Sequence, residues 1–269
     1  MERTLCIHVP IMIIKPISYT FFEEYYSEAQ KKSLQRKVKV YSGLDQSVLF
    51  HKGSMQIDVD GSPRAYFPKN ANPLRLDDVS SADGESGSTT YVQGQTYNIN
   101  GKKITATGPR PGFFVSATAL QYDPSIMWNC DNFVDAEAVS YFIFPVHRFG
   151  MRLGDAGVII HIPTWKWTPA IFADTNNATR VSEVSLKAAI NLDRAKIDPT
   201  TELVDKNGLS AGNGDDDRNY FYLYFPGSNV AAALTTPHWP EGAVRLRGIQ
   251  CFHNWGGLDM VKECLAQMP

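Results

Sequence analysis

Hydrophobic and polar residues alternate in short runs along most of this chain. Clusters of Gly, Pro, Asn and Asp separate the runs, and this arrangement is typical of β-strands joined by turns. The strands predicted in this way are Ser47–Val59, Tyr91–Ile99, Gly112–Ala117, Ser140–Pro145, Gly157–Ile162, Thr168–Ala173, Tyr220–Phe225 and Val244–Phe252. The pattern predicts a mainly β fold.

Three segments have helical spacing instead. Residues 19–36 place aromatic and aliphatic residues on one side and glutamates and lysines on the other. Ser182–Leu192 and Leu258–Gln267 are the other two predicted helices. Because no repeat or sharp linker divides the chain, we expect an N-terminal helical extension over residues 1–45 and a single β-domain over residues 46–269.

The composition is that of an ordinary globular protein. The chain has 269 residues, of which 43% are hydrophobic and 20% charged, and this length can bury a sizeable core. The formal net charge of -2 gives no electrostatic footprint for nucleic acid, so we expect no nucleic-acid partner.

The N-terminal stretch Leu5–Ile14 is apolar but short. His8 and Pro10 interrupt it, no small-residue cleavage site follows, and it cannot cross a bilayer. We therefore expect no membrane span. We expect a secreted or exported protein that lacks a clear signal peptide, with a non-classical route or a leader already removed.

The sequence shows no pattern for a metal or a cofactor. The segment Asp58–Gly61 resembles the start of a calcium loop, but its glycine is misplaced and the twelfth position is Lys69. Histidine spacing fits no metal motif, and nucleophile-elbow, Walker and dinucleotide patterns do not occur. The cysteines are widely separated, their pairing stays open, and they are Cys6, Cys130, Cys251 and Cys264. We expect no metal and no cofactor.

Two carboxylates stand out at the end of one predicted strand and the start of the next helix. The apolar strand ends on Asp174, a polar loop follows, and Glu183 opens the predicted helix. Cleavage of a glycosidic bond needs such a pair, one to protonate the leaving oxygen and one to activate water or attack. The helix N-terminus would favour ionised Glu183 as base, and apolar neighbours would raise the pKa of Asp174 as acid.

Five short motifs accompany this pair in a defined order. They are Gln56–Gly61 with its continuation Ser62–Tyr66, Gly112–Leu120, Val134–Tyr141, Leu153–Asp155, and Asp174-Thr175 with Glu183–Ser185. In order and rough spacing they resemble the family-75 glycoside hydrolases, the fungal and bacterial chitosanases.

The resemblance implies a β-barrel related to the double-psi barrels, with a few peripheral helices. It also implies an inverting endo-hydrolase in which Asp174 and Glu183 are catalytic. The chain departs from the family at two turns: Asn176-Asn177 replaces a Gly-Pro pair, and Ser182 replaces a glycine before the glutamate.

Chitosan carries protonated amines, so acids are expected along its binding cleft. Together with other residues of the matching motifs, the expected substrate-binding residues are Asp58, Asp60, Arg64, Tyr66, Thr118, Asp135, Asp155 and Thr175.

Three functions remain open. The first is a chitosanase-like endo-glycosidase acting on β-1,4-linked amino-sugar polymers. The second keeps the mechanism but acts on peptidoglycan, as a cell-wall hydrolase or antibacterial effector. The third is a non-catalytic carbohydrate-binding protein. Each has a polysaccharide partner.

Overall fold

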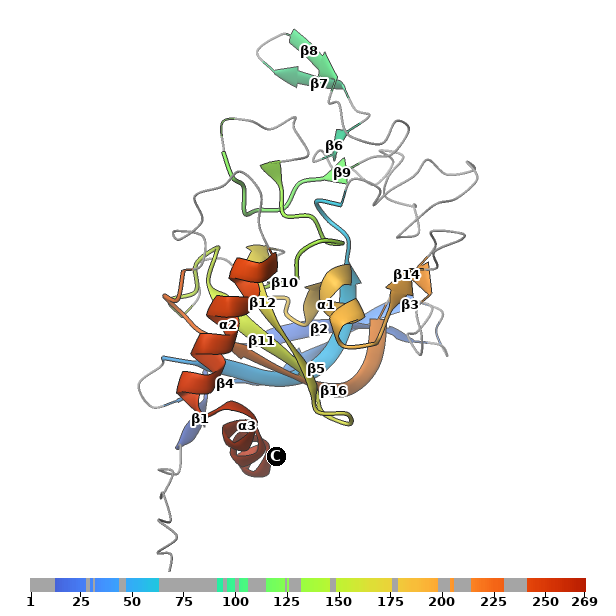
Figure 1. Cartoon of the computed structure of the whole chain (residues 1–269). Helices are drawn as coiled ribbons and strands as arrows, with labels where there is room; N and C mark the ends of the chain where they lie inside the picture. Colours follow the sequence, from blue (N-terminus) through green and yellow to red (C-terminus); the bar gives the residue numbers. More distant parts are fainter. Residues whose placement is uncertain are drawn as a thin grey trace, which may run out of the picture.

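The structure is a computed structural model of the chain. It describes residues 13–27, 30, 32–43, 47–62, 91–93, 96–99, 102–105, 115–123, 125, 132–145, 149–175, 179–197, 204–205, 214–229 and 241–269. Figure 1 shows a curved sheet with two C-terminal helices on one side.

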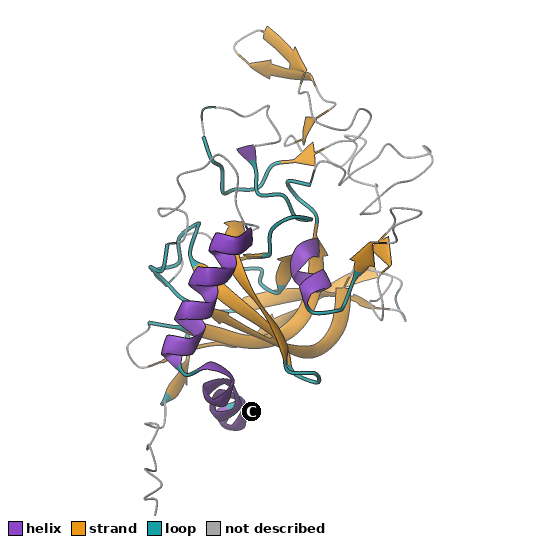
Figure 2. Ribbon diagram, viewed as in Figure 1, coloured by secondary structure: helices purple, strands orange, loops and turns teal. Residues whose placement is uncertain are grey.

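A closed barrel of six strands forms the centre of the molecule (Figure 2). Its strands, in order around the barrel, are β5 (Leu49–Asp58), β13 (Glu183–Ser185), β10 (Tyr141–Ile143), β12 (Lys166–Asp174), β11 (Ala156–His161) and β16 (Gly214–Tyr224). Pairing of β16 with β5 closes the ring, and parallel and antiparallel neighbours are mixed. The prediction of a mainly β fold with a barrel and few peripheral helices is confirmed.

The predicted helix over residues 19–36 is wrong. This segment forms β2 (Phe21–Ser27) and β3 (Lys32–Val38), which pair antiparallel from Phe21↔Val38 to Ser27↔Lys32. Exposure alternates along β2 as in a strand, because Phe21 and Glu23 are buried whereas Phe22 and Glu24 are partly exposed. Two further strands add to the sheet beside β5, namely β4 (Val40–Gly43) and β1 (Ile14–Pro16).

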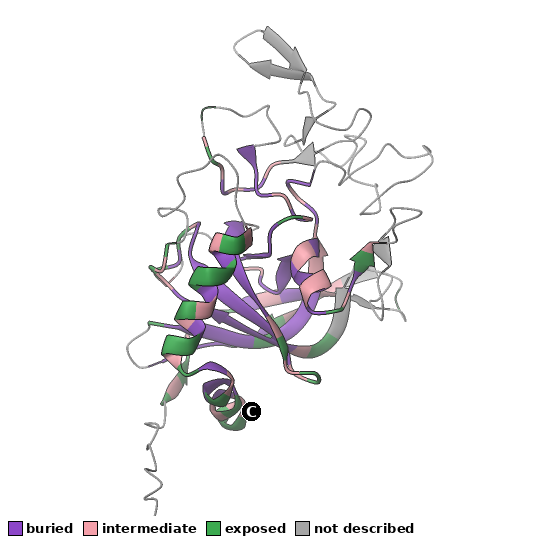
Figure 3. Cartoon of the chain, in the orientation of Figure 1, coloured by how far each residue is buried: buried purple, intermediate pink, exposed green. Residues whose placement is uncertain are grey.

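Alternating side chains divide the core into two layers. Phe142, Phe172 and Tyr222 belong to the inner layer, to which all six barrel strands contribute. Their neighbours Tyr141 and Ile171 face outward into the second layer, which the C-terminal helices cover. In Figure 3 the barrel strands are buried and the outer side of the helix pair is exposed.

The outer layer is covered by α2 (Glu241–Trp255) and α3 (Gly257–Gln267). The predicted strand Val244–Phe252 is therefore wrong, whereas the last helix is confirmed. Val244, Gly248 and Phe252 are the buried residues of α2, and a spacing of four is helical.

The helix predicted from Ser182 begins later than expected. Glu183–Ser185 is the barrel strand β13, and α1 (Leu186–Asn191) follows it. Ser185 is the N-cap, and its hydroxyl accepts a hydrogen bond from the backbone amide of Ala188. Pairing of β13 between β5 and β10 overrides the local helical preference.

The remaining strands form small two-stranded sheets. They are β6 (Tyr91–Gln93) with β9 (Val115–Ser116), β7 (Thr96–Ile99) with β8 (Lys102–Thr105), and β14 (Lys196–Ile197) with β15 (Val204–Asp205). None of the helices in the described ranges is long and apolar enough to cross a membrane.

Candidate active site at the ends of β5 and β12

The barrel topology brings the two predicted catalytic residues to neighbouring positions. Asp174 ends β12 and pairs with Ile143 of β10. On the other side of β10, Phe142 pairs antiparallel with Val184, which places Glu183 beside Ile143. One strand therefore lies between Asp174 and Glu183, and two strand spacings put their Cα atoms about 10 Å apart.

Asp174 belongs to a group of three carboxylates. Asp58 ends β5 and Asp60 follows it, and carboxylate oxygens of all three residues lie within 4.8 Å of one another. Asp174 is 6% exposed, and its Oδ1 accepts hydrogen bonds from the backbone amides of Ala119 (2.9 Å) and Thr175 (2.7 Å). Its side chain is also hydrogen-bonded to Asp60. We call Asp58, Asp60 and Asp174 the carboxylate trio.

The surroundings of the carboxylate trio favour the protonated forms. Burial, followed by the nearby charge of Asp60, raises the pKa of Asp174 well above its usual range. Burial also raises the pKa of Asp58, and Asp60 and Asp174 raise it further. The expectation that Asp174 has a raised pKa is confirmed.

Tyr141 supports the carboxylate trio from the neighbouring part of the sheet. Its phenolic hydroxyl donates to Oδ2 of Asp58 and to the backbone carbonyl of Asp60, both at 3.1 Å. The backbone amide of Asp60 donates to Oδ1 of Asp58 at 3.0 Å. These bonds fix the two aspartates relative to the barrel wall.

Glu183 has a different electrostatic environment. It forms an ion pair with Arg180, and Arg180 Nη1 also donates to Glu24 Oε1 at 3.1 Å. The expectation that a helix N-terminus stabilises ionised Glu183 is wrong, because Glu183 begins β13 and the helix starts only after this strand, at Leu186. A guanidinium group replaces the helix dipole as the group that favours ionised Glu183.

The loop after β5 docks closely against the 118–134 region. Gly61 has a φ of +77°, and a Cβ there would lie 2.1 Å from the carbonyl oxygen of Val134. Thr118 accepts a hydrogen bond from Val134 N at 3.0 Å and donates to Leu120 O at 2.9 Å. Thr118 is therefore a buried link between loops, and it holds the segment whose Ala119 amide binds Asp174.

The other predicted substrate-binding residues have different positions. The carboxylate of Asp155 is buried and accepts from three backbone amides, those of Arg152, Gly227 and Asn229, so it fixes turns outside the carboxylate trio. Asp135 accepts from Glu137 N at 2.8 Å in a local turn. Thr175 contributes its backbone amide to Asp174. Arg64 and Tyr66 lie outside the described residues.

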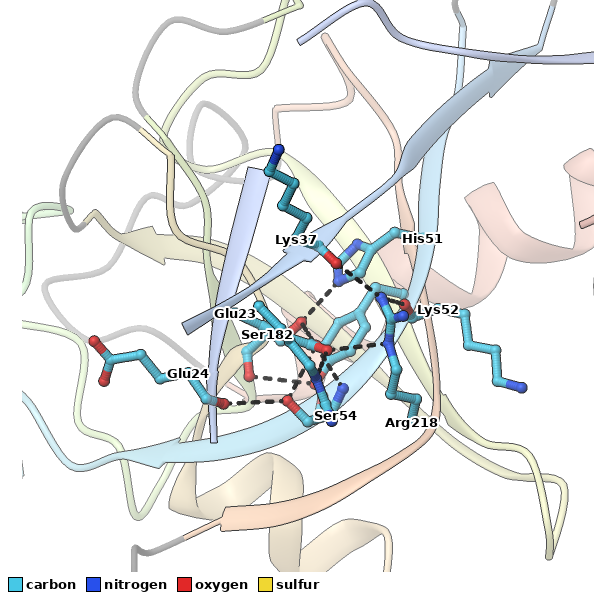
Figure 4. A network of polar contacts seen from close by, with 10 residues as sticks. Glu23, Glu24, Lys37, His51, Lys52, Ser54, Ser182 and Arg218 are labelled. Carbon is cyan, nitrogen blue, oxygen red and sulfur yellow. Dashed lines mark hydrogen bonds and ion pairs between the residues drawn. The ribbon is translucent and has the colours of Figure 1, made fainter. Parts of the chain in front are cut away.

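Ser182 has a left-handed backbone with a φ of 74°. Its hydroxyl is hydrogen-bonded to His51 Nε2 at 2.9 Å and to Glu23 Oε2 at 3.1 Å. All three residues are buried, and Figure 4 shows their side chains converging. Because a serine at positive φ is unfavourable, these hydrogen bonds stabilise a conformation that glycine adopts readily.

Glu23 is the centre of this polar network. Its Oε2 accepts from the amide and hydroxyl of Ser54, and its Oε1 pairs with Arg36 at 2.5 Å and Arg218 at 3.1 Å. His51 stacks on Tyr222, and burial, together with the charge of Arg218, lowers the pKa of His51 to about 3. The network ties β2 to the residue directly before Glu183.

Sequence reasoning missed the supporting residues of the site. Arg180 lies three positions before Glu183, and Tyr141 closes one of the matching motifs, so their positions offered a signal. Glu23 and Glu24 offered none, because the segment was predicted as a helix. Glu23 and Glu24 are adjacent residues of β2. Glu23 accepts a hydrogen bond from Ser182 and Glu24 accepts one from Arg180, so both glutamates bind the segment that leads into β13.

The carboxylate trio is also the group of described residues that could hold a divalent cation. Oxygen ligands suit hard cations such as Ca²⁺, which takes about six to eight of them. Three carboxylates would supply only part of that shell. Sharing of a proton among the three aspartates, in contrast, needs no ligand beyond the three carboxylates.

Two cavities bounded by described residues lie elsewhere on the molecule. One is lined by Tyr41, Arg218 and three lysines, and the other by Lys15 and Phe149 with their neighbours.

Comparison with known proteins gave no match to a family model and no match to a curated protein.

Proposed function

We propose that the protein is a glycoside hydrolase that cleaves amino-sugar polymers by general acid and base catalysis. The observation that supports this function best is the placement of Asp174 and Glu183 on the two sides of β10. A Cα separation of about 10 Å allows the two side chains to face one substrate with a water between them, as an inverting mechanism needs.

Asp174 is the acid in this proposal. Burial and the adjacent Asp60 raise the pKa of its carboxyl group, which favours the protonated form that a general acid needs at the start of the reaction. Asp174 gives its proton to the glycosidic oxygen as the bond between that oxygen and the anomeric carbon breaks. The amides of Ala119 and Thr175 then stabilise the carboxylate that remains.

Glu183 is the base. Its ion pair with Arg180 favours the ionised form, which can take a proton from water. The water oxygen attacks the anomeric carbon on the face opposite the leaving group. The product is a hemiacetal of inverted configuration, and the proton on Glu183 returns to Asp174 through solvent.

The charge around the pair supports an amino-sugar substrate. The carboxylate trio is one acidic group, and Arg180, which pairs with Glu183, also interacts with the charge of Asp58. Burial lowers the pKa of Arg180, and Glu24 and Asp58 oppose this shift. A protonated amine on the sugar would complement the carboxylates. This argument favours chitosan over a fully acetylated polymer.

The proposal is tested by measuring reducing ends released from chitosan, from chitin oligomers and from purified peptidoglycan sacculi. We expect release from chitosan and a loss of about 100-fold or more in both Asp174→Asn and Glu183→Gln. Asp259→Asn, an exposed change on α3, is the matched control and should retain full activity.

The same assay separates the alternatives. Activity on sacculi alone would replace chitosan by peptidoglycan as the substrate. Binding of a polymer without any release of reducing ends would support the non-catalytic function. Loss of activity in a chelator such as EDTA would assign the carboxylate trio to a cation rather than to proton sharing.

A further inference from the structure

A basic cavity lies on the side of the barrel formed by β3, β4, β5 and β16. It has a volume of about 340 Å³, within the range of small-molecule sites. Four of its lining residues are cations, and the complete lining consists of Lys37, Lys39, Tyr41, Lys52, Arg218, Met268 and Pro269. We call it the basic pocket.

Arg218 is held in place at the basic pocket. Its Nε pairs with Glu23 Oε1 at 3.1 Å, and its Nη2 lies 3.5 Å and 3.4 Å from the backbone carbonyls of Lys37 and Lys52. Figure 4 shows the guanidinium between Glu23 and these two lysines. The fork is therefore oriented before any ligand binds, and this orientation suits bidentate contact with an oxyanion.

The side chains that line the basic pocket bring no negative charge to balance its cations. Lys37, Lys39 and Lys52 are exposed, and within the described part of the chain none of them has an ion-pair partner. Glu23 is buried and already shared between Arg36 and Arg218. Positive charge is concentrated here in a chain whose formal net charge is -2.

We propose that the basic pocket binds a small phosphorylated anion. Phosphate suits the site because Arg218 offers a planar fork and the lysines add point charges around it. Tyr41 and Met268 give the cavity an apolar side, which can contact the organic part of a phosphate ester. A cavity of this volume suits a small molecule.

The basic pocket is separate from the carboxylate trio. Lys52 and Asp58 lie on the same strand, β5, six positions apart, or about 20 Å along the chain. The proposed binding at the basic pocket uses no residue of the carboxylate trio, although Glu23 links Arg218 to Ser182, the residue before Glu183. It requires neither Asp174 nor Glu183.

The proposal is tested by isothermal titration calorimetry of the full chain with sodium pyrophosphate. We expect saturable binding by the wild type that weakens with added salt, and a loss of affinity of about tenfold or more in the double variant Lys37→Gln, Lys52→Gln. Lys15→Gln is the matched control, since Lys15 is an exposed lysine that lines the other cavity. It should bind as the wild type does.

Arg218 is left unchanged in the test because it also holds Glu23. Both substituted lysines are exposed, and unfolding midpoints without ligand will show that the double variant folds. No saturable binding by the wild type would overturn the proposal. Equal affinities of the wild type and the double variant would also overturn it, because the anion would then bind elsewhere.

Discussion

Single residues around β13 are held in unfavourable states by buried polar contacts. Ser182 has a positive φ, His51 is uncharged, and Asp174 is buried among other acids. Strain and shifted pKa values of this kind concentrate at functional sites. Three predictions follow from the contacts of these residues.

Ser182 is predicted to tolerate glycine better than alanine. Both substitutions remove the hydroxyl that binds Glu23 and His51, so both should lower the free energy of unfolding. Alanine also keeps a Cβ at a φ of 74°, which costs about 1 kcal/mol more than glycine. Urea unfolding of Ser182→Gly and Ser182→Ala measures the difference. Equal stabilities would contradict a strained backbone.

Asp174→Asn is predicted to be more stable than the wild type at neutral pH. The pKa of Asp174 is raised in the folded protein. The stability that the protonated side chain contributes is therefore fully present below the pKa of the unfolded chain, and it is lost as the pH rises through the pKa of the folded protein. Asparagine keeps an oxygen for the amides of Ala119 and Thr175 and has no charge to bury. Urea unfolding at about pH 5 and about pH 8 should show a larger gain at the higher pH. A constant difference would argue against a shifted pKa.

His51 is predicted to make the fold sensitive to acid. Its folded-state pKa of about 3 lies below the usual value of 6.5, so protonation favours the unfolded chain. The free energy of unfolding is highest above the pKa of His51 in the unfolded chain. It falls by up to about 1.4 kcal/mol per pH unit as the pH drops toward the pKa of His51 in the folded protein. His51→Gln should reduce this slope in urea unfolding, and the exposed control His253→Gln should leave it unchanged.

At the scale of elements, local patterns predicted most strands and failed where tertiary pairing decided the outcome. The strand around Gly157 and the last helix are confirmed. β11 is a short apolar run that is buried throughout, and the buried residues of α3 have helical spacing. Residues 19–36 contain aromatic pairs that fit either period, and pairing of β2 with β3 decides for strands. The segment from Glu183 is a strand only because β5 and β10 lie on both sides of it.

The contact between α2 and the barrel depends on a glycine. A Cβ on Gly248 would lie 2.6 Å from the Cβ of Pro169 in β12, whereas a Cβ on Gly242 would meet nothing within 4 Å. We expect Gly248→Ala to destabilise the protein by about 1–3 kcal/mol. Gly242→Ala, in the same helix, should be neutral or stabilise by up to about 1 kcal/mol. Thermal unfolding of the two variants checks the prediction, which fails if Gly248→Ala is the more stable one.

At the scale of the whole molecule, the fold brings together acids that are far apart in the sequence. Asp58, Asp60, Asp174 and Glu183 are all candidates from the sequence. The barrel brings the first three together and places Glu183 on the other side of β10 from Asp174. Sequence position signalled Tyr141 and Arg180 but not their contacts, which depend on the register of strands, and it did not signal Glu24, whose contact depends on the packing of β2. The sequence alone also gave no reason to place Asp155 apart from the carboxylate trio.

The acidic and basic regions of the molecule are separated along β5. The carboxylate trio lies at the end of this strand, and the basic pocket includes its residue Lys52. A cationic polymer would be attracted to the first region and a small anion to the second. The two proposed activities can therefore be tested by independent variants.

The central claim is that Asp174 and Glu183 act as an inverting acid and base pair. A proton NMR time course of a β-1,4-linked glucosamine oligomer during hydrolysis tests it most directly, because the first anomer formed reports the geometry of attack. We predict that the wild type produces the α-anomer first, before mutarotation, and that Asp174→Asn produces neither anomer. Initial appearance of the β-anomer, or no hydrolysis by the wild type, would contradict the account.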